Sequence, residues 1–166
     1  MLELKKLSPY DGKEIYDMLQ GINKEENGFI NEVKDMPYEE FLHWLNQNAD
    51  ISNSVNLPDG WVPQTTFWLY CDNTPVGIGR IRHYLNDSLR ENGGHIGYAI
   101  SSSYRGKGYG NEILRLLLTE CNNMGISEAL VDPYKSNESS TKIVIRNGGK
   151  LQRETDSKNY FLITIS

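Results

Sequence analysis

The spacing of hydrophobic residues along the chain predicts a succession of strands and helices. Leucines at positions 2, 4 and 7 alternate roughly with charged residues, as in a strand. Ser8-Pro9 is a typical helix start, and Pro37 opens a second helix at a position that proline favours. The apolar residues at helical spacing are Ile15, Met18, Leu19 and Ile22 in the first helix, and Phe41, Trp44, Leu45 and Ala49 in the second.

The second half of the chain is richer in predicted strands. Residues 65–72 and 76–85 contain many β-forming residues, and Asn73-Thr74-Pro75 between them predicts the turn of a hairpin. The elements expected afterwards are a strand at 95–100, a helix at 109–124, a strand at 128–132, a helix at 137–146 and strands at 150–155 and 159–165. The polar segments 21–36, 50–64 and 86–93 are predicted loops. This order implies a mixed sheet with helices on both faces, in a single α/β domain over residues 1–166.

A glycine-rich turn lies between the strand at 95–100 and the helix at 109–124. Gly106, Gly108 and Gly110 are each separated by one residue. The first N–H groups of a helix have no partner within the helix, and its dipole places positive charge there. Glycines also let a ligand approach the backbone closely. The turn therefore predicts a site for a phosphate-bearing cofactor.

Two common phosphate-binding loops do not fit this turn. A P-loop needs G-x-x-x-x-G-K-[ST], but Gly108 follows Lys107 and no hydroxyl residue is placed for magnesium. A Rossmann fingerprint needs G-x-G-x-x-G near a first strand, whereas G-x-G-x-G stands here in the middle of the chain. The pattern that remains is Arg-x-x-Gly-x-Gly, formed by Arg105, Gly108 and Gly110.

This pattern resembles the pyrophosphate loop of the GNAT superfamily of acyl-CoA-dependent N-acyltransferases. In that family a later helix has the form N-x-x-[AS]-x-x-[hydrophobic]-Tyr-x-x-x-Gly-[aromatic]. The chain fits this form at four positions, Asn137, Ser140, Ile143 and Gly148. The specific motifs cover about residues 94–149, and the order of elements agrees over nearly the whole chain. The run from Arg80 to Tyr98 looks like an uncharacterised bacterial branch of the family.

The resemblance implies an α+β fold with a mixed, mostly antiparallel sheet of about seven strands. It implies acetyl-CoA as co-substrate and direct transfer of an acyl group to a primary amine of a small molecule or a protein. The diphosphate would lie on the N–H groups of residues 106–111, the pantetheine arm along residues 98–100, and Asn137 would bind a pantetheine amide. The implied cofactor-binding residues are Tyr98, Ala99, Ile100, Arg105, Gly106, Lys107, Gly108, Tyr109, Gly110, Asn111 and Asn137. For Arg105 and Lys107, simple solvation is an equal alternative.

Two residues are candidate general bases, since an alkylamine titrates near ~10 and must lose a proton before it attacks. Asp132 lies five residues before Asn137, where some family members carry a glutamate base, although Asp before Pro133 is also a common turn residue. His95 starts the strand near which other members place a base, and its near-neutral pKa suits the role. A structural role for His95 is the alternative, and His83 and Glu91 are weaker candidates. A backbone N–H near Ala99 or Ile100 would stabilise the oxyanion.

Position 144 departs from the family pattern. The tyrosine that protonates the leaving thiolate in many members is Val144 here, which cannot donate a proton. A thiol near ~8.5 can leave unprotonated, so the departure puts a dedicated general acid in doubt, not the reaction. Tyr134 and Tyr104 could substitute or could simply pack. Val144 also keeps open a non-catalytic acyl-CoA-binding sensor or interaction module, and a redox nucleotide enzyme is a third reading.

Composition narrows the expected partners. The net charge of −5 lacks the basic footprint of a nucleic-acid binder and is compatible with a cationic amine. The acceptor would be chosen by segments 21–36, with Glu25, Glu26 and Phe29, and 50–64, with Trp61, unless these are merely solvated loops. The acceptor's identity, the acyl chain length and the oligomeric state stay open, and a homodimer is one expected form.

The remaining sequence signals concern location and metals. No run approaches the ~20 apolar residues of a membrane span, and the N-terminus lacks the features of a signal peptide, so a cytoplasmic protein is expected. Cys71 and Cys121 are expected to be buried. No Cys/His spacing typical of zinc is present, so no metal is predicted.

Overall fold

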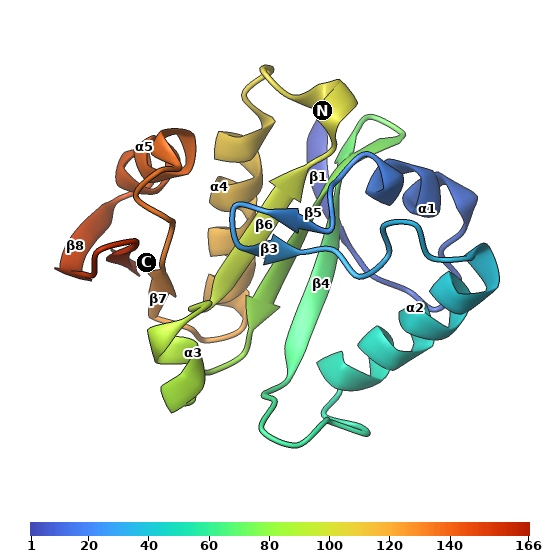
Figure 1. Ribbon diagram of the computed structural model, residues 1–166, viewed down its shortest axis with the longest axis horizontal. Coiled ribbons are helices and arrows are strands. Elements are labelled where there is room, and N and C mark those ends of the chain that lie inside the picture. The colour runs from blue at the N-terminus through green and yellow to red at the C-terminus, as the bar shows by residue number, and fades with distance from the viewer.

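A four-stranded antiparallel sheet organises the larger half of the molecule, in a computed structural model that describes residues 1–166 (Figure 1). In spatial order its strands are β1 (Leu2–Lys6), β4 (Gln64–Cys71), β5 (Thr74–Arg82) and β6 (Ile96–Ile100). The predicted hairpin is the β4–β5 pair. β6 is one of the two outer strands, so only one of its two edges pairs with a neighbour in this sheet.

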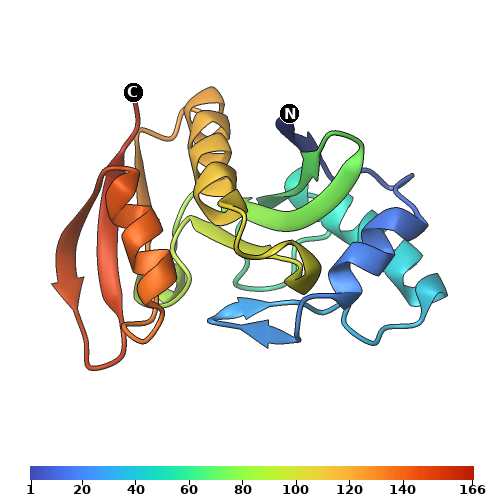
Figure 2. The same cartoon turned by 90° about the horizontal axis from the view of Figure 1, so that it is seen from above.

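A three-stranded antiparallel sheet forms the smaller half. It consists of β7 (Glu128–Val131), β9 (Asn159–Thr164) and β8 (Gly149–Glu154), with β9 in the middle. These two sheets together hold seven antiparallel strands, against the single sheet of about seven that was expected, and a separate pair of short strands brings the total to nine. The sheets join where the backbone N–H of His95 donates to the carbonyl of Leu130 at 2.8 Å. Figure 2 shows the two halves side by side, with α4 between them.

Helices cover both faces of the larger sheet, as predicted. α1 (Lys13–Gln20) and α2 (Tyr38–Ser52) lie on one face, and α4 (Tyr109–Asn123) lies on the other (Figure 2). Alternation along β4 explains this layering, because Trp68 packs with the first pair while Phe67 and Leu69 pack with α4. α5 (Glu138–Arg146) packs beside α4 and against β8.

Some element boundaries differ from those expected. α1 begins at Lys13 because Ser8 and Asp11 close a turn, in which the Ser8 N–H donates to the Asp11 carboxylate at 2.8 Å. The predicted loop 50–64 is shorter, since α2 continues to Ser52. Short elements also lie in predicted loops: β2 (Glu25–Glu26), β3 (Phe29–Ile30) and α3 (Asp87–Glu91). A 3-10 turn, η1 (Ser102–Tyr104), precedes the glycine loop.

Both cysteines are at least partly buried, as expected. Cys121 is inaccessible to solvent, and burial raises the pKa of its thiol to about 12. Cys71 accepts a hydrogen bond from the Tyr109 hydroxyl at 3.3 Å. None of the helices is both long and apolar enough to cross a lipid bilayer.

Candidate active site

A cleft of about 620 Å³ opens beside the joint between the two sheets. One wall is β6, and the opposite wall is the segment 131–134 with the first turns of α5. The glycine loop closes one end of the cleft. The β2–β3 hairpin crosses in front of β6 (Figure 1), and its Phe29 ring lies against Gly97. The predicted cofactor-binding residues all line this cleft except Lys107.

The glycine loop presents a row of backbone donors to the cleft. Gly106 and Gly108 have φ values of 79° and 82°, and a Cβ at either would meet nothing within 4 Å. Glycine is therefore required here by the backbone conformation, because there is no crowding around either position. Gly108 caps α4 without a side-chain bond, and the N–H groups of residues 106–111 find no acceptor within the chain. Such a row of unpaired N–H groups at a helix N-terminus suits a phosphate.

The outer edge of β6 offers further backbone groups. In an antiparallel ladder, residues alternate between hydrogen-bonded and non-bonded pairs. The Arg82 N–H donates to His95 and the Ser101 N–H to Val76, so the odd-numbered residues of β6 bond to β5. The N–H and C=O groups of Tyr98 and Ile100 therefore point toward the cleft. Those of Ala99 point toward β5, which makes Ala99 a poor oxyanion donor.

Asn137 and Ser140 lie at the start of α5. The Asn137 side-chain oxygen caps the helix by accepting from the Ser140 N–H at 3.2 Å, which leaves its amide nitrogen unpaired. The Ser140 hydroxyl lies 3.2 Å from the hydroxyl of Tyr98. Burial raises the pKa of Tyr98, although the bond to Ser140 lowers it, so the phenol stays protonated. No sequence pattern predicted a role for these hydroxyls, although Ser140 occupies the [AS] position of the motif.

Arg105 ties the glycine loop to the hairpin above the cleft. Its Nε donates to the Ile100 carbonyl and its Nη2 to the Glu26 carboxylate, both at 3.0 Å. Burial would raise the pKa of Glu26, but hydrogen bonds from Arg105 and Asn23 outweigh it and hold the pKa below its usual value. Arg105 is therefore engaged within the chain.

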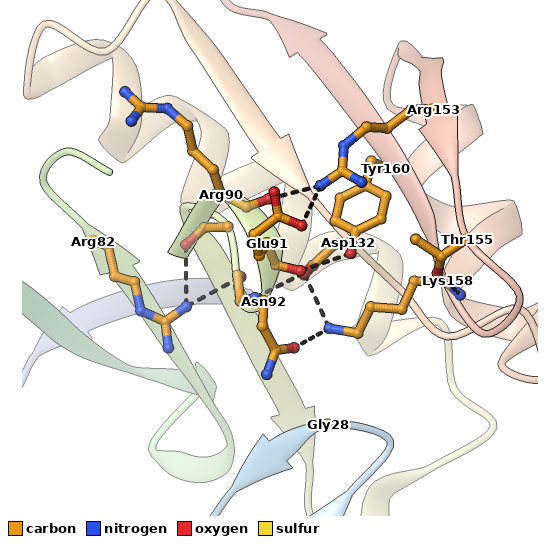
Figure 3. A network of polar contacts seen from close by, with 12 residues as sticks. Gly28, Arg82, Arg90, Glu91, Asn92, Asp132, Arg153, Thr155, Lys158 and Tyr160 are labelled. Carbon is orange, nitrogen blue, oxygen red and sulfur yellow. Dashed lines mark hydrogen bonds and ion pairs between the residues drawn. The ribbon is translucent and has the colours of Figure 1, made fainter. Parts of the chain in front are cut away.

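Asp132 lines the cleft but is held in a polar network (Figure 3). Its Oδ2 accepts from the Gly93 N–H at 2.7 Å and from the Lys158 ammonium at 3.1 Å. Lys158 also donates to the side-chain oxygen of Asn92. The side chains of Asp132 and Lys158 are only 7% and 11% exposed. Oδ2 is therefore occupied by two donors, and only Oδ1, which accepts no hydrogen bond within the chain, is open to take a proton from an amine.

His95 does not lie in the cleft, which corrects its assignment as a base. Its Nδ1 accepts from the Leu130 N–H at 2.9 Å, so the ring clamps the two sheets together. Burial, helped by the charges of Arg82 and Arg90, lowers the pKa of His95 to about 4. His95 instead borders a separate surface hollow, together with His83 and Glu91.

The other residues considered for proton donation or acceptor binding lie partly in the cleft and partly outside it. Val144 is wholly buried in the core, so its side chain takes no part in the cleft. Some residues that were expected to bind the acceptor or to donate a proton do line the cleft: Glu26, Phe29, Tyr104 and Tyr134. Glu25 and Trp61 do not line it.

Comparison with known proteins identifies this architecture. The family model described as an acetyltransferase (GNAT) domain matches residues 2–150. The chain belongs to the GNAT acetyltransferase family. It is therefore an enzyme of the acyltransferase class. A comparison with curated protein sequences finds no relative.

Solved structures share the fold at low sequence identity. RimL, a ribosomal L7/L12 alpha-N-protein acetyltransferase in complex with CoA, has a TM-score of 0.74 and 16% identity, with 99% of this chain and 94% of that chain covered. A GNAT acetyltransferase from Streptococcus pneumoniae has a TM-score of 0.66 and 15% identity over both whole chains. The Campylobacter jejuni N-acetyltransferase PseH with acetyl-CoA has a TM-score of 0.64 and 12% identity, also over both whole chains.

Proposed function

We propose that this GNAT enzyme transfers the acetyl group of acetyl-CoA to a primary amine of a small molecule or a protein. The observation that carries the proposal is the row of unpaired backbone N–H groups at residues 106–111, at one end of a cleft walled by β6. RimL and PseH, which share the fold, bind CoA and acetyl-CoA respectively. No group of three or more His, Cys, Asp or Glu side chains in the chain could hold a metal ion.

The residues of the cleft fit the parts of acetyl-CoA. The diphosphate would accept from the N–H groups of residues 106–111, assisted by the dipole of α4. The pantetheine amides would pair with the free N–H and C=O groups of Tyr98 and the free N–H of Ile100, as an additional strand pairs with a sheet edge, while the Ile100 carbonyl already accepts from Arg105. The unpaired side-chain nitrogen of Asn137 would donate to a pantetheine carbonyl from the opposite wall.

The chemistry is direct attack of the amine on the thioester carbonyl. An outward-facing N–H of β6, from Tyr98 or Ile100, would stabilise the developing oxyanion. A fixed donor of this kind is worth roughly 3 kcal/mol. The Tyr98–Ser140 hydroxyl pair would donate a hydrogen bond to the leaving sulfur, a role that Val144 cannot fill. Among the carboxylates that line the cleft, Asp132 is the best candidate for a general base. Its ion pair with Lys158 makes it better suited to a structural role, in which it fixes the wall of the cleft.

Thiol release separates an enzyme from a binding module. Purified protein is mixed with acetyl-CoA and a panel of primary amines, and free CoA is measured with a thiol reagent. Amine-dependent release supports the proposal. The matched test is Tyr98→Phe, which should lower kcat while the Kd for acetyl-CoA stays unchanged. Acetyl-CoA binding without release for any amine would favour a sensor or interaction module.

A further inference from the structure

Two arginines of β5 border the cleft at the end away from the glycine loop. Arg80 pairs in register with Gly97, whereas Gly77 pairs with Ile100, which leads into the loop. At about 3.3 Å per residue, Arg80 lies about 10 Å along the sheet from that end. Arg82 lies two residues further on the same face, and both arginines line the cleft. They are therefore placed away from the groups that suit the cofactor's phosphates.

Arg82 is a partly buried cation without a carboxylate partner. Its Nη1 donates to the carbonyl oxygens of Gly93 and Gly94, each at 3.1 Å (Figure 3). None of the ion pairs of the chain includes Arg82. Burial and then the charge of Arg80 lower the pKa of Arg82, while Asp132 raises it. Buried charges in proteins are usually paired, so this guanidinium lacks an anion.

Arg80, two residues before Arg82, is by contrast buried and held within the chain. The residue is only 6% exposed. Its Nη1 donates to the Ile30 carbonyl at 2.9 Å and its Nη2 to Glu32 at 3.0 Å, and its guanidinium lies over the Phe29 ring. Its Nε has no partner, and only one other buried side-chain polar atom in the chain shares that condition. Because this Nε is buried and both Nη atoms are bonded within the chain, Arg80 contributes positive charge beside the cleft and offers no free donor to it.

The charges at this end of the cleft do not balance. Glu32 compensates Arg80, and Asp132 compensates Lys158. Arg82 then remains as an excess positive charge in a chain whose net charge is −5. Glu26 does not neutralise it, because its carboxylate bonds to Arg105. The acceptor end is therefore cationic, contrary to the cationic acceptor that the acidic composition suggested.

We propose that the acceptor amine carries a carboxylate, which binds Arg82 at the end of the cleft opposite the glycine loop. The planar fork of a guanidinium matches the two oxygens of a carboxylate. The substrate class is thus an amino acid or a peptide with an acidic residue near its amino terminus. This inference rests on the proposed function and specifies the acceptor of the same site.

Matched pairs of amines test the proposal. Thiol release is measured with free amino acids against their amides, with Glu-containing tripeptides against the corresponding Gln tripeptides, and with polyamines. The carboxylate member of one pair should have a kcat/KM at least about tenfold higher. The amino-acid arm and the tripeptide arm show which source supplies the carboxylate. Equal or higher rates with amides, Gln tripeptides or polyamines would overturn the inference and leave the transferase function standing.

Arg82→Gln removes the charge and keeps an N–H donor for the Gly93 and Gly94 carbonyls. It should raise the KM for the carboxylate amine about tenfold or more and leave the KM for acetyl-CoA unchanged. Arg115→Gln is the matched control, because Arg115 lies on α4 outside the cleft and pairs with Glu112. A preference for carboxylates that persists in Arg82→Gln would contradict the assignment.

Calorimetry keeps the two proposals distinguishable. If acetyl-CoA binds but no amine releases thiol, the transferase proposal fails on its own. The same amine pairs are then titrated into the CoA complex. Tighter binding of the carboxylate members, lost in Arg82→Gln, supports the anion site. Equal binding of the members of each pair, or none, overturns it.

Discussion

The Asp132–Lys158 pair provides the sharpest test of how the cleft wall is held. Asp132→Ala leaves the Lys158 ammonium, which is 11% exposed, without its carboxylate and frees the Gly93 N–H. Breaking a buried ion pair on one side costs about 3–5 kcal/mol. A domain of this size loses about 2–4 °C in Tm per kcal/mol, so we expect a drop of about 10 °C. Lys158→Met should destabilise the protein similarly.

The double variant separates the pair from its surroundings. Removing both charges avoids an unpaired buried ion, so the double variant should cost much less than the sum of the two single variants. Urea unfolding of the four proteins should give a coupling energy of about 3 kcal/mol. The exposed pair Lys135–Glu154 is the matched control, and its coupling should stay below about 1 kcal/mol.

Variants at the same two positions, with Asp132→Asn added, show whether Asp132 acts as a base. If the ion pair only positions the wall, both single variants should lower kcat by similar factors. If Asp132 takes the proton, Lys158→Met keeps activity while Asp132→Asn loses it at unchanged stability. Single variants that each cost less than about 1 kcal/mol and combine additively would refute the structural role.

Three further predictions follow from the site. Gly108→Ala forces a side chain into a φ of 82°, at about 1–2 kcal/mol, and should weaken acetyl-CoA binding as measured by calorimetry. Gly60→Ala, with a φ of 80° outside the cleft, should carry a similar strain and leave binding unchanged. His95 has a lowered pKa, so the unfolded state binds its proton first, and stability should fall as the pH drops from 6.5 to about 4. His95→Asn should flatten that part of the pH–stability curve from urea unfolding, whereas the exposed His43→Asn should not. Tyr98→Phe should lower kcat without changing the Kd for acetyl-CoA, and a parallel loss of both would mean that the hydroxyl only shapes the cleft.

Local signals in the sequence were sufficient for most of the fold and for the glycine loop at one end of the cleft. Apolar periodicity located α2, α4 and the central strands, because each buries one continuous stripe or face. The spacing of Gly106 and Gly108 predicted a glycine-rich turn before α4, and both residues have positive φ in the structure. The same reasoning could have found the β2–β3 hairpin, since Asn27-Gly28 is a strong turn signal and both residues have positive φ.

The other end of the cleft and the position of His95 depend on contacts between segments that are far apart in the sequence. His95 looked like a base because its type and position suited one, but its partner Leu130 is 35 residues away in sequence. Asp132 pairs with Lys158, which is 26 residues away in sequence, and no local pattern predicts that pair. Likewise, Arg80 and Glu32 are 48 residues apart, so the charge balance of the cleft emerges only from the folded chain.

Hydrogen exchange of backbone amides with and without acetyl-CoA tests the central claim most directly. If acetyl-CoA lies in this cleft, exchange should slow at residues 106–111 and at the outer-edge amides of Tyr98 and Ile100. The Ala99 amide, which already faces β5, should change little by comparison. Binding of acetyl-CoA that leaves the amides of residues 106–111 unprotected, or protects a different surface, would contradict the account.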